Sequence, residues 1–381
     1  MLTLLLKEIR HNPLLWLLVF VPVVFAAEKL ASDAPTLLFV LSILAIVPLA
    51  ALLSHATESV AAKTGDAVGG LLNATLGNLT ELVIALAALR AGEYVLVKAS
   101  IAGAIVANTL FMLGASFLLG GLKHRVQEYS RVGARFQASL LFLATIALLI
   151  PTSLADKERA SAEVMQTLSL ALAVLLIVAY GLGLVFSLKT HRDVFSSAEH
   201  ADSGEVPWPL GLALATLAGV TVLVALVSEV FVASVQEAAE TFGMSPAFVG
   251  FIVVALVGGA AEMASAFSGA RKNRLDLSVG IALGSAAQIA LFVAPVLVLT
   301  SYFVGPKPMD LLFWPGAVTL IVISTVVVAF ITSGGRSAWF VGVLALVVYL
   351  TIAMTLYVLP PRTQGSGGPI MHEPVSEASP R

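Results

Sequence analysis

The chain has 381 residues, of which 59% are apolar and 12% are charged, and its mean hydropathy is +0.98. Soluble domains carry about 25% charged residues, so this composition indicates an integral membrane protein with the lipid bilayer as its partner. The formal net charge of −2 argues against a nucleic acid as a partner, and the absence of cysteine excludes disulfides, thiolate metal sites and cysteine nucleophiles.

Long apolar segments separated by charges run through the whole sequence. A membrane helix needs about 20 mostly apolar residues, and on this basis we expect about eleven such spans in an all-α polytopic membrane protein. Their approximate cores are residues 13–30, 35–55, 67–89, 99–121, 136–155, 164–188, 207–228, 247–269, 277–302, 311–332 and 338–358.

The first span, within residues 1–30, has some features of a cleaved signal peptide. Lys7 and Arg10 precede its apolar run, which ends in two alanines. Trp16 and prolines interrupt the run, however, so we expect the segment to be retained as an extra N-terminal transmembrane helix.

The distribution of Lys and Arg among the loops predicts the orientation in the membrane. With a cytoplasmic N-terminus, most of the basic residues, including Arg271, Lys272 and Arg274, fall on the cytoplasmic side. We therefore expect the N-terminus inside and the C-terminus outside. Without a transit-type segment or cysteines, the sequence favours the plasma (inner) membrane of a prokaryote.

Two polar segments interrupt the apolar pattern late in the chain. Residues 189–206 form the longest polar insertion, and we interpret them as a cytoplasmic linker between two halves. Residues 359–381 are rich in Pro, Gly and Ser, which predicts a disordered C-terminal tail.

The two halves share an internal repeat. Residues 68–81 (VGGLLNATLGNLTE) align with residues 249–262 (VGFIVVALVGGAAE). Glu81 is the single charge between Asp66 and Arg90, and Glu262 is the single charge between Glu240 and Arg271. The identical pairs are Val68/Val249, Gly69/Gly250, Ala74/Ala255, Gly77/Gly258 and Glu81/Glu262.

The repeat extends to units of five helices, residues 35–188 and 207–358. With one gap, Asn108 falls near Gln288 in the helix that follows each glutamate helix. Because five is odd, the second copy must be inverted relative to the first. The sequence thus predicts a five-plus-five inverted repeat, which is typical of secondary transporters with a site near the midplane.

A paired-carboxylate site follows from this symmetry. A charge at mid-membrane costs roughly 2.5–3.5 kcal/mol on insertion scales, and such residues mark ion or proton paths. Two carboxylates held close together cannot both stay ionised without a cation, so protons or a hard divalent cation would discharge the pair. Ca²⁺ prefers carboxylate, amide and backbone oxygens as ligands. Exclusive binding of metal or protons is a basis for antiport.

The residues around each glutamate refine this expectation. At about 100° per residue, Asn73, Gly77, Thr80 and Glu81 are expected to share one helix face. Gly77, like Gly258 in the second half, lies one turn before its glutamate and can loosen the helix so that carbonyls face an ion.

Other polar residues have two interpretations each. Asn108 and Gln288 either contribute to the site or bond neighbouring helices together. Glu58, Glu237 and Glu240 lie near span ends, where they are either solvated caps or carboxylates on the path of ion access.

At these motifs the chain resembles the Ca²⁺/cation–proton antiporters of the calcium/cation exchanger superfamily. GGLLNATLGNLTELVIALAAL (69–89) resembles the first signature of that family, and GGAAEMASAF (258–267) with GIALGSAAQIALFVAP (280–295) resembles the second. The resemblance covers nearly the whole chain, from about the second span to the last.

The resemblance implies roles for particular residues. In the family, the glutamates of both signatures bind Ca²⁺ and exchange it for protons, which points to Glu81 and Glu262. Backbone carbonyls near Gly77 and Gly258 would complete the site. The polar neighbours that carry over are Asn78, Asn108, Ser285 and Gln288.

The chain also departs from the family pattern. The second signature typically has Asn and His where this chain has Gly259 and Met263, and two serines of the first half are replaced by Ala104 and Ala107. These four differences leave the selectivity among cations open.

We interpret the chain as a secondary active transporter that exchanges Ca²⁺ or a related cation for protons by alternating access, without enzymatic activity. It has no GxxxxGK[ST] phosphate loop, and we expect no cofactor besides the transported ions. A Na⁺/Ca²⁺ exchanger, a passive cation channel and a membrane enzyme are the alternatives. Stoichiometry, direction and oligomeric state, a homo-oligomer included, stay open.

Overall fold

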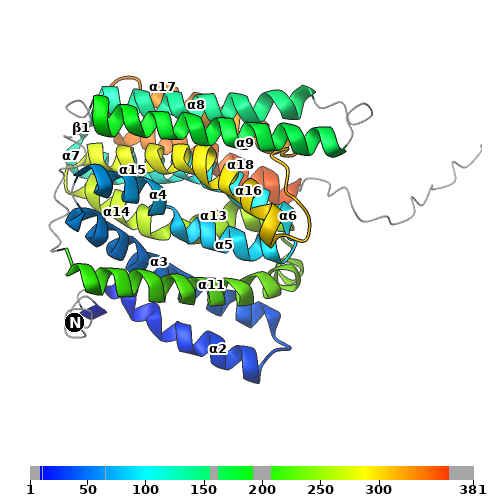
Figure 1. Ribbon diagram of the computed structural model, residues 1–381. Helices are drawn as coiled ribbons and strands as arrows, with labels where there is room; N and C mark the ends of the chain where they lie inside the picture. The colour runs from blue at the N-terminus through cyan, green and yellow to red at the C-terminus, as the bar shows by residue number, and fades with distance from the viewer. Residues whose placement is uncertain (1–8, 11, 65, 155–161, 192–206, 360–381) are drawn as a thin grey trace, which may run out of the picture.

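The computed structural model describes residues 9–10, 12–64, 66–154, 162–191 and 207–359, and nearly all of them are helical (Figure 1). The predicted linker and tail lie almost wholly outside the described residues, as do residues 1–8. The elements of the first half are a 3₁₀ segment (Pro13–Val19), α2 (Phe20–Leu30), α3 (Pro35–Lys63), α4 (Asp66–Leu76), α5 (Leu79–Arg90), α6 (Tyr94–Val106), α7 (Leu113–His124), β1 (Val126–Glu128), α8 (Arg131–Leu154) and α9 (Ala162–Val185).

The second half contains the same kinds of element. They are α11 (Leu210–Thr241), α12 (Pro246–Phe248), α13 (Ala255–Gly258), α14 (Ala260–Arg271), α15 (Leu275–Gln288), α16 (Ala294–Val304), α17 (Pro315–Ile331), β2 (Arg336–Ala338) and α18 (Trp339–Val358). The other helical stretches are π-helical: Ala107–Met112, Phe186–Thr190, Val249–Val254 and Ile289–Val293.

The helices are long and apolar enough for a multi-pass membrane protein. Among the described residues, eight single helices are long and apolar enough to cross a membrane. The number rises to ten if each of two bent helix pairs counts as one membrane span. This confirms the predicted all-helical membrane fold. The apolar helix α17 has 17 residues and is shorter than these, so the predicted count of about eleven spans stays a prediction.

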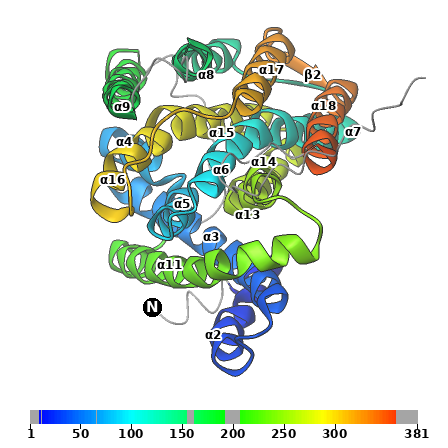
Figure 2. The same cartoon turned by 90° about the vertical axis from the view of Figure 1, so that its right-hand side faces the viewer.

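The bundle has a centre and two flanks, which Figure 2 shows nearly end-on. The centre consists of α4–α5, α6–α7, α13–α14 and α15–α16. Helices α8, α9, α17 and α18 lie along one side of it, and α3, α11 and α2 lie along the other (Figures 1 and 2). Of these candidate spans, Tyr94–His124 is the most enclosed, because 83% of its most apolar 18 residues are buried inside the bundle. Its residues are therefore available to build an internal site.

Helices α3 and α11 pack against each other along most of their lengths. The rings of Phe39 and Phe231 stack between them with centroids 5.2 Å apart. Helix α11 also packs on α5, and α3 packs on α4 and α14. The two long helices therefore cover the two glutamate-bearing helices from the same side.

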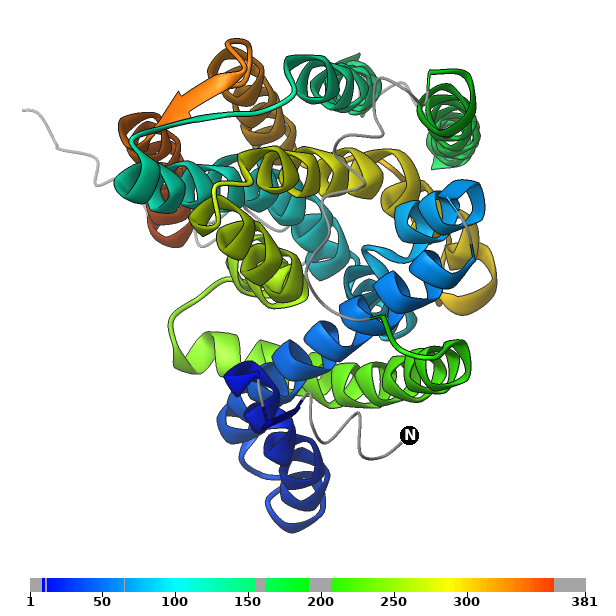
Figure 3. The same ribbon diagram turned by 90° about the vertical axis from the view of Figure 1, so that its left-hand side faces the viewer.

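The bundle has two ends, which we call face A and face B. Face A carries the antiparallel pair β1–β2, in which Gln127 lies opposite Ser337 (Figure 3). There Gln127 Nε2 donates to the carbonyl of Ala270 at 2.9 Å, and the Ser130 amide donates to Asp276 Oδ1 at 2.7 Å. These bonds fasten the loop after α7 to the second half.

Face B is the opposite end, where α5 and α16 finish. The loop between α16 and α17 is fastened there to the first half, because Lys98 Nζ lies 2.6 Å from Asp310 Oδ1 and 2.9 Å from the Leu312 carbonyl. Each half thus holds a loop of the other half, at opposite ends of the bundle.

Candidate ion-binding site

Two helices break at the centre of the bundle, each just before a glutamate. The first break falls at Gly77 and Asn78, between α4 and α5, where the axis bends by 41°. The second falls at Gly259, between α13 and α14, with a bend of 58°. Both helices therefore change direction near Gly77 and Gly258, and the expectation that carbonyls there face an ion stays a prediction.

The breaks place both carboxylates in the first turns of new helices. Glu81 lies in the first turn of α5 and Glu262 in the first turn of α14. A helix N-terminus favours negative charge because its first amides have no partner within the helix. The broken helices thus support a charge that an unbroken membrane helix would not.

The expected shared helix face does not exist, because the bend separates its members. Asn73 on α4 is exposed, whereas Thr80 on α5 is buried. The prediction that Asn73, Gly77, Thr80 and Glu81 form one stripe was wrong for this reason. A sequence pattern read at a constant 100° per residue does not survive a bend in the axis.

The side chain of Glu81 lies against the second helix break. A side-chain carbon added at Gly258 would lie 3.0 Å from Glu81 Cγ and 3.6 Å from Glu81 Oε1. Glu81 therefore packs on the bare backbone one turn before Glu262. A residue larger than glycine at 258 would displace this carboxylate.

A buried hydrogen-bond network connects the first break to two neighbouring helices. Asn108 Nδ2, in the π-helical stretch after α6, donates to Ser285 Oγ of α15 at 2.8 Å. Ser285 Oγ in turn donates to Asn78 Oδ1 at 2.6 Å. All three side chains are buried. The network fixes the amide of Asn78 at the point where α4 becomes α5.

The remaining predicted amide, Gln288, occupies the place that matches Asn108. Its Oε1 would lie 3.4 Å from a carbon added at Gly77, and Asn108 Oδ1 would lie 3.7 Å from a carbon added at Gly259. Each amide therefore faces the broken helix of the other half.

Several buried polar atoms here have no protein partner among the residues that the structure describes. They are Asn78 Nδ2, Gln288 Nε2 and Glu262 Oε2. Leaving a buried polar group unpaired costs about 1–3 kcal/mol. Three such atoms in one place suit a site that exchanges polar or ionic ligands better than a packing core.

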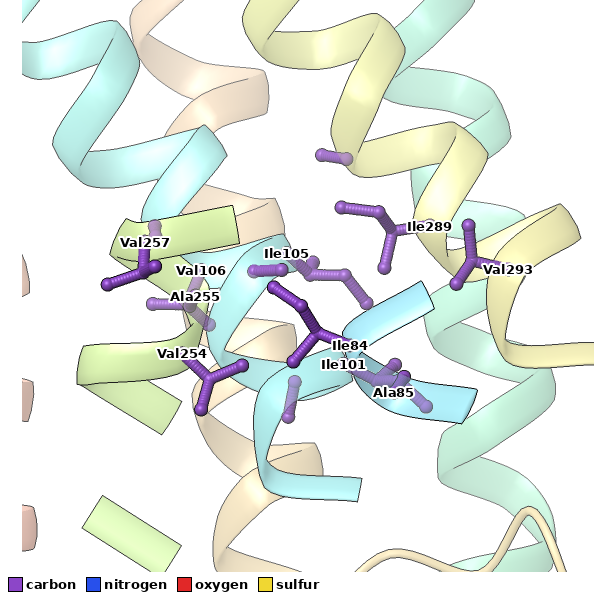
Figure 4. Packing of buried hydrophobic residues seen from close by; sticks show 14 of the residues in the cluster. Ile84, Ala85, Ile101, Ile105, Val106, Val254, Ala255, Val257, Ile289 and Val293 are labelled. Carbon is purple, nitrogen blue, oxygen red and sulfur yellow. The ribbon is translucent and has the colours of Figure 1, made fainter. Parts of the chain in front are cut away.

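A cluster of apolar side chains packs on the face-B side of the site, and Figure 4 shows part of it. Its buried members follow Glu81 on α5, lie on α6 before Asn108, lie before the break that precedes Glu262, and follow Gln288 in the π-helical stretch after α15. All of them lie toward face B. They are Ile84, Ile101, Ile105, Val254, Val257, Ile289 and Val293.

Toward face A the surroundings are exposed. Asn73, Ser268 and Gly280 are exposed on the face-A side of the site, and a carbon added at Gly280 would meet no atom within 4 Å. Glu58, near the face-A end of α3, is also exposed. The two sides of the site are thus unequal.

The other two acids of the ion-access prediction lie at face B. Glu237 lines a cavity of about 520 Å³ between α5 and α11, and Glu240 is exposed nearby. The same cavity holds an ion pair that the sequence analysis missed, Arg90 Nη1 to Glu229 Oε1 at 3.0 Å. The charge of Arg90 at the end of a glutamate helix was the available signal, but its partner is 139 residues away.

Where the chain departs from the family pattern, it has apolar atoms at the centre. Met263, Ala104 and Ala107 are buried. The Met263 methyl would lie 3.4 Å from a carbon added at Gly259. Among the described residues no group of three or more His, Cys, Asp or Glu side chains could hold a metal. A cation between the glutamates would therefore need amide and backbone oxygens as well.

The network at Ser285 makes a first prediction, on stability. Ser285→Ala removes the hydroxyl that pairs with both asparagines, which leaves two buried amide atoms unsatisfied. We expect the free energy of unfolding to fall by about 1–3 kcal/mol per unpaired group, measured as earlier thermal unfolding in detergent. Ser139→Ala is the matched control because its exposed hydroxyl bonds only the Arg135 carbonyl of its own helix. Equal unfolding of the two variants would contradict the network.

A multi-pass bundle whose broken helices bring carboxylates and amides to a buried centre defines a membrane ion transporter. Residues 34–189 and 212–358 match the family model described as sodium/calcium exchanger protein. The chain belongs to this family, which confirms the resemblance drawn from the two motifs.

Similar proteins of known name agree with this assignment. The chain is 40% identical to a Ca²⁺/H⁺ antiporter of Aphanothece halophytica, with 90% of this chain and 96% of the relative covered. It is 38% identical to the Ca²⁺/H⁺ antiporter ChaA of Bacillus subtilis, with 84% and 92% covered.

Among solved structures, that of native YfkE superposes with a TM-score of 0.77 at 34% identity, covering 90% of this chain and 100% of that one. The H⁺/Ca²⁺ exchanger CAX, at 15% identity, has a TM-score of 0.69 over 92% of this chain and 88% of that one, and shows the shared fold.

Proposed function

We propose that this protein exchanges Ca²⁺ for protons across a membrane. The names of its relatives support this exchange. The observation that carries the proposal at the level of residues is the contact of Glu81 with the broken turn before Glu262. Two carboxylates there can hold a divalent cation or protons, and either ligand discharges the pair.

The ion would be held by more than the two carboxylates. Ca²⁺ takes six to eight oxygen ligands, so we assign supporting roles to carbonyls at the breaks near Gly77 and Gly258. The side chains of Asn78, Asn108, Ser285 and Gln288 would orient this shell. Glu58 would assist ion access from face A, and Glu237 and Glu240 from face B.

Alternating access is the mechanism that we propose for the exchange. The apolar cluster between the site and face B, together with the exposed side chains toward face A, supports a conformation open to face A. The other conformation would arise because residues 35–188 and 207–358 are inverted repeats. Eleven spans result if the two bent pairs and α17 join the eight long helices, with the segment before residue 35 as the extra span.

We place face A in the cytoplasm of a prokaryote, with the N-terminus inside and the C-terminus outside. Basic residues at face A support this orientation, among them Lys63, Lys123, Arg125, Arg271 and Lys272. The proton gradient would supply the energy, so the protein would need neither a cofactor nor an enzymatic reaction. The oligomeric state, a homo-oligomer included, is a separate question.

Uptake into proteoliposomes tests the exchange directly. With an imposed pH gradient, acidic inside, we expect radioactive Ca²⁺ to accumulate against its own gradient and external Na⁺ to be unnecessary. Uptake driven by a Na⁺ gradient and insensitive to pH would instead identify a Na⁺/Ca²⁺ exchanger. Equilibration without accumulation, in the presence of the pH gradient, would identify a passive channel.

A further inference from the structure

A cavity at face A lies apart from the ion-binding site, where α7 and α14 end side by side. Its volume is about 510 Å³, and it is lined by Leu119, Leu122, Lys123 and Arg271. Lys123 and Arg271 are both exposed, as is Leu122 at 65%. The four residues combine a basic end with an apolar wall in one cavity.

The positive charge at this cavity is not compensated by a carboxylate. Lys123 Nζ donates to the Arg271 carbonyl at 3.0 Å, and the His124 ring nitrogen Nε2 lies 3.0 Å from the same oxygen. Neither Lys123 nor the guanidinium of Arg271 forms an ion pair with any residue that the structure describes. The ammonium and guanidinium groups are therefore available to an external anion.

Arg90, which matches Arg271 in the first half, does form an ion pair with a carboxylate. Arg90 ends α5 as Arg271 ends α14, and Arg90 binds Glu229 of α11 at 3.0 Å. Among the described residues, a carboxylate thus pairs with Arg90 but none pairs with Arg271. The unpaired copy is also the one that lies beside a second basic side chain, Lys123.

The leucines of the cavity indicate which kind of anion would bind there. A small soluble anion needs only the basic groups, and the half-buried Leu119 and the exposed Leu122 beside them would gain nothing from its binding. A phospholipid has both parts: its phosphate meets Lys and Arg at the level of the headgroups, and its acyl chain covers apolar side chains. Basic pockets between membrane helices are known to bind anionic headgroups.

We propose that this cavity binds one anionic phospholipid of the face-A leaflet. Lys123 and Arg271 contact its phosphate, and Leu119 and Leu122 contact its first methylene groups. The lipid would thereby join the ends of α7 and α14. Since α14 carries Glu262 in its first turn, the lipid would hold the opposite end of a site helix in place.

Titration of the purified full-length protein in detergent tests this proposal. Dioleoylphosphatidylglycerol is added, and bound lipid is counted by native mass spectrometry alongside the thermal unfolding temperature. We expect one saturable lipid and a rise in the unfolding temperature, neither of which the same amount of dioleoylphosphatidylcholine produces. The double variant Lys123→Gln, Arg271→Gln should bind the anionic lipid about 30-fold more weakly, which corresponds to about 1 kcal/mol per basic side chain near a membrane surface.

Two controls keep the outcomes distinct. Lys272→Gln removes an exposed charge next to Arg271 that does not line the cavity, and should bind like the parent. The conservative variant Lys123→Arg, Arg271→Lys should retain binding if the charge is what matters. Equal binding by the parent and the Gln variant, or an equal effect of glycerol 3-phosphate without acyl chains, would overturn the lipid site.

Discussion

Gradient-driven Ca²⁺ uptake is expected to disappear in both Glu81→Gln and Glu262→Gln. Glutamine keeps the shape and the hydrogen-bonding capacity of the side chain but neither binds a proton nor supplies a negative charge. We expect a loss of more than about 100-fold for each variant, since residues that only orient metal ligands already cost 10- to 100-fold in affinity when mutated. The measurement is the initial rate of radioactive Ca²⁺ uptake into proteoliposomes with an imposed pH gradient.

The matched control is Glu163→Gln. Glu163 lies in the first turn of α9, is exposed, and carries the same carboxylate far from the centre of the bundle. It should transport at the parental rate. Uptake that survives at Glu81→Gln or at Glu262→Gln, with equal amounts of reconstituted protein, would remove that residue from the site.

The two substitutions should also fail in the same step. If both carboxylates hold the same ion, Ca²⁺ uptake and the coupled release of protons, followed with a pH-sensitive dye inside the vesicles, should be lost together. Proton flux that persists without Ca²⁺ uptake in one variant would mean that the two glutamates hold different ions. The site would then consist of two half-sites.

The sequence alone singles out these carboxylates as candidates because a membrane places an unusual constraint on charge. A single glutamate within a long apolar segment is conspicuous, and its match in the second half is improbable without an internal repeat. Gly77 and Gly258 were informative for a similar reason, since a membrane helix that breaks needs a residue tolerant of other backbone conformations.

The partners of these residues could not be derived in the same way. The bond from Ser285 to Asn78 spans 207 residues and depends on how α15 packs against the broken turn. The pairing of Gln127 with Ser337 is equally distant in sequence, and three-residue strands give no periodic signal. Nor does a predicted inverted repeat say on which side of the site apolar side chains gather, because either arrangement is compatible with the same sequence. The apolar cluster at Ile84 and Ile105 becomes informative only when its position relative to Glu81 is known.

The substitution Gly103→Ala is expected to reduce the amount of folded protein, because the two halves are in close contact at Gly103. A carbon added at Gly103 of α6 would overlap the carbonyl oxygen of Phe251, in the π-helical stretch before α13. From the other side, a carbon added at Gly250 would lie 2.6 Å from Ala99 Cβ. The backbones of the two halves therefore cross at van der Waals contact, as small residues allow in membrane helices.

Even one methyl group at this crossing must push two backbones apart, because no flexible side chain is there to yield. Overpacked cores typically lose about 1–3 kcal/mol, and a backbone obstacle places Gly103→Ala at or above the upper end of that range. We expect a clearly lower unfolding temperature and a reduced monodisperse fraction by fluorescence-detected size-exclusion chromatography.

The control is Gly219→Ala in α11, where the added carbon meets no atom within 4 Å. Since alanine favours a helix over glycine, that variant should be as stable as the parent. Equal unfolding temperatures for the two variants would show that α6 and the stretch at Phe251 are farther apart than their contact implies.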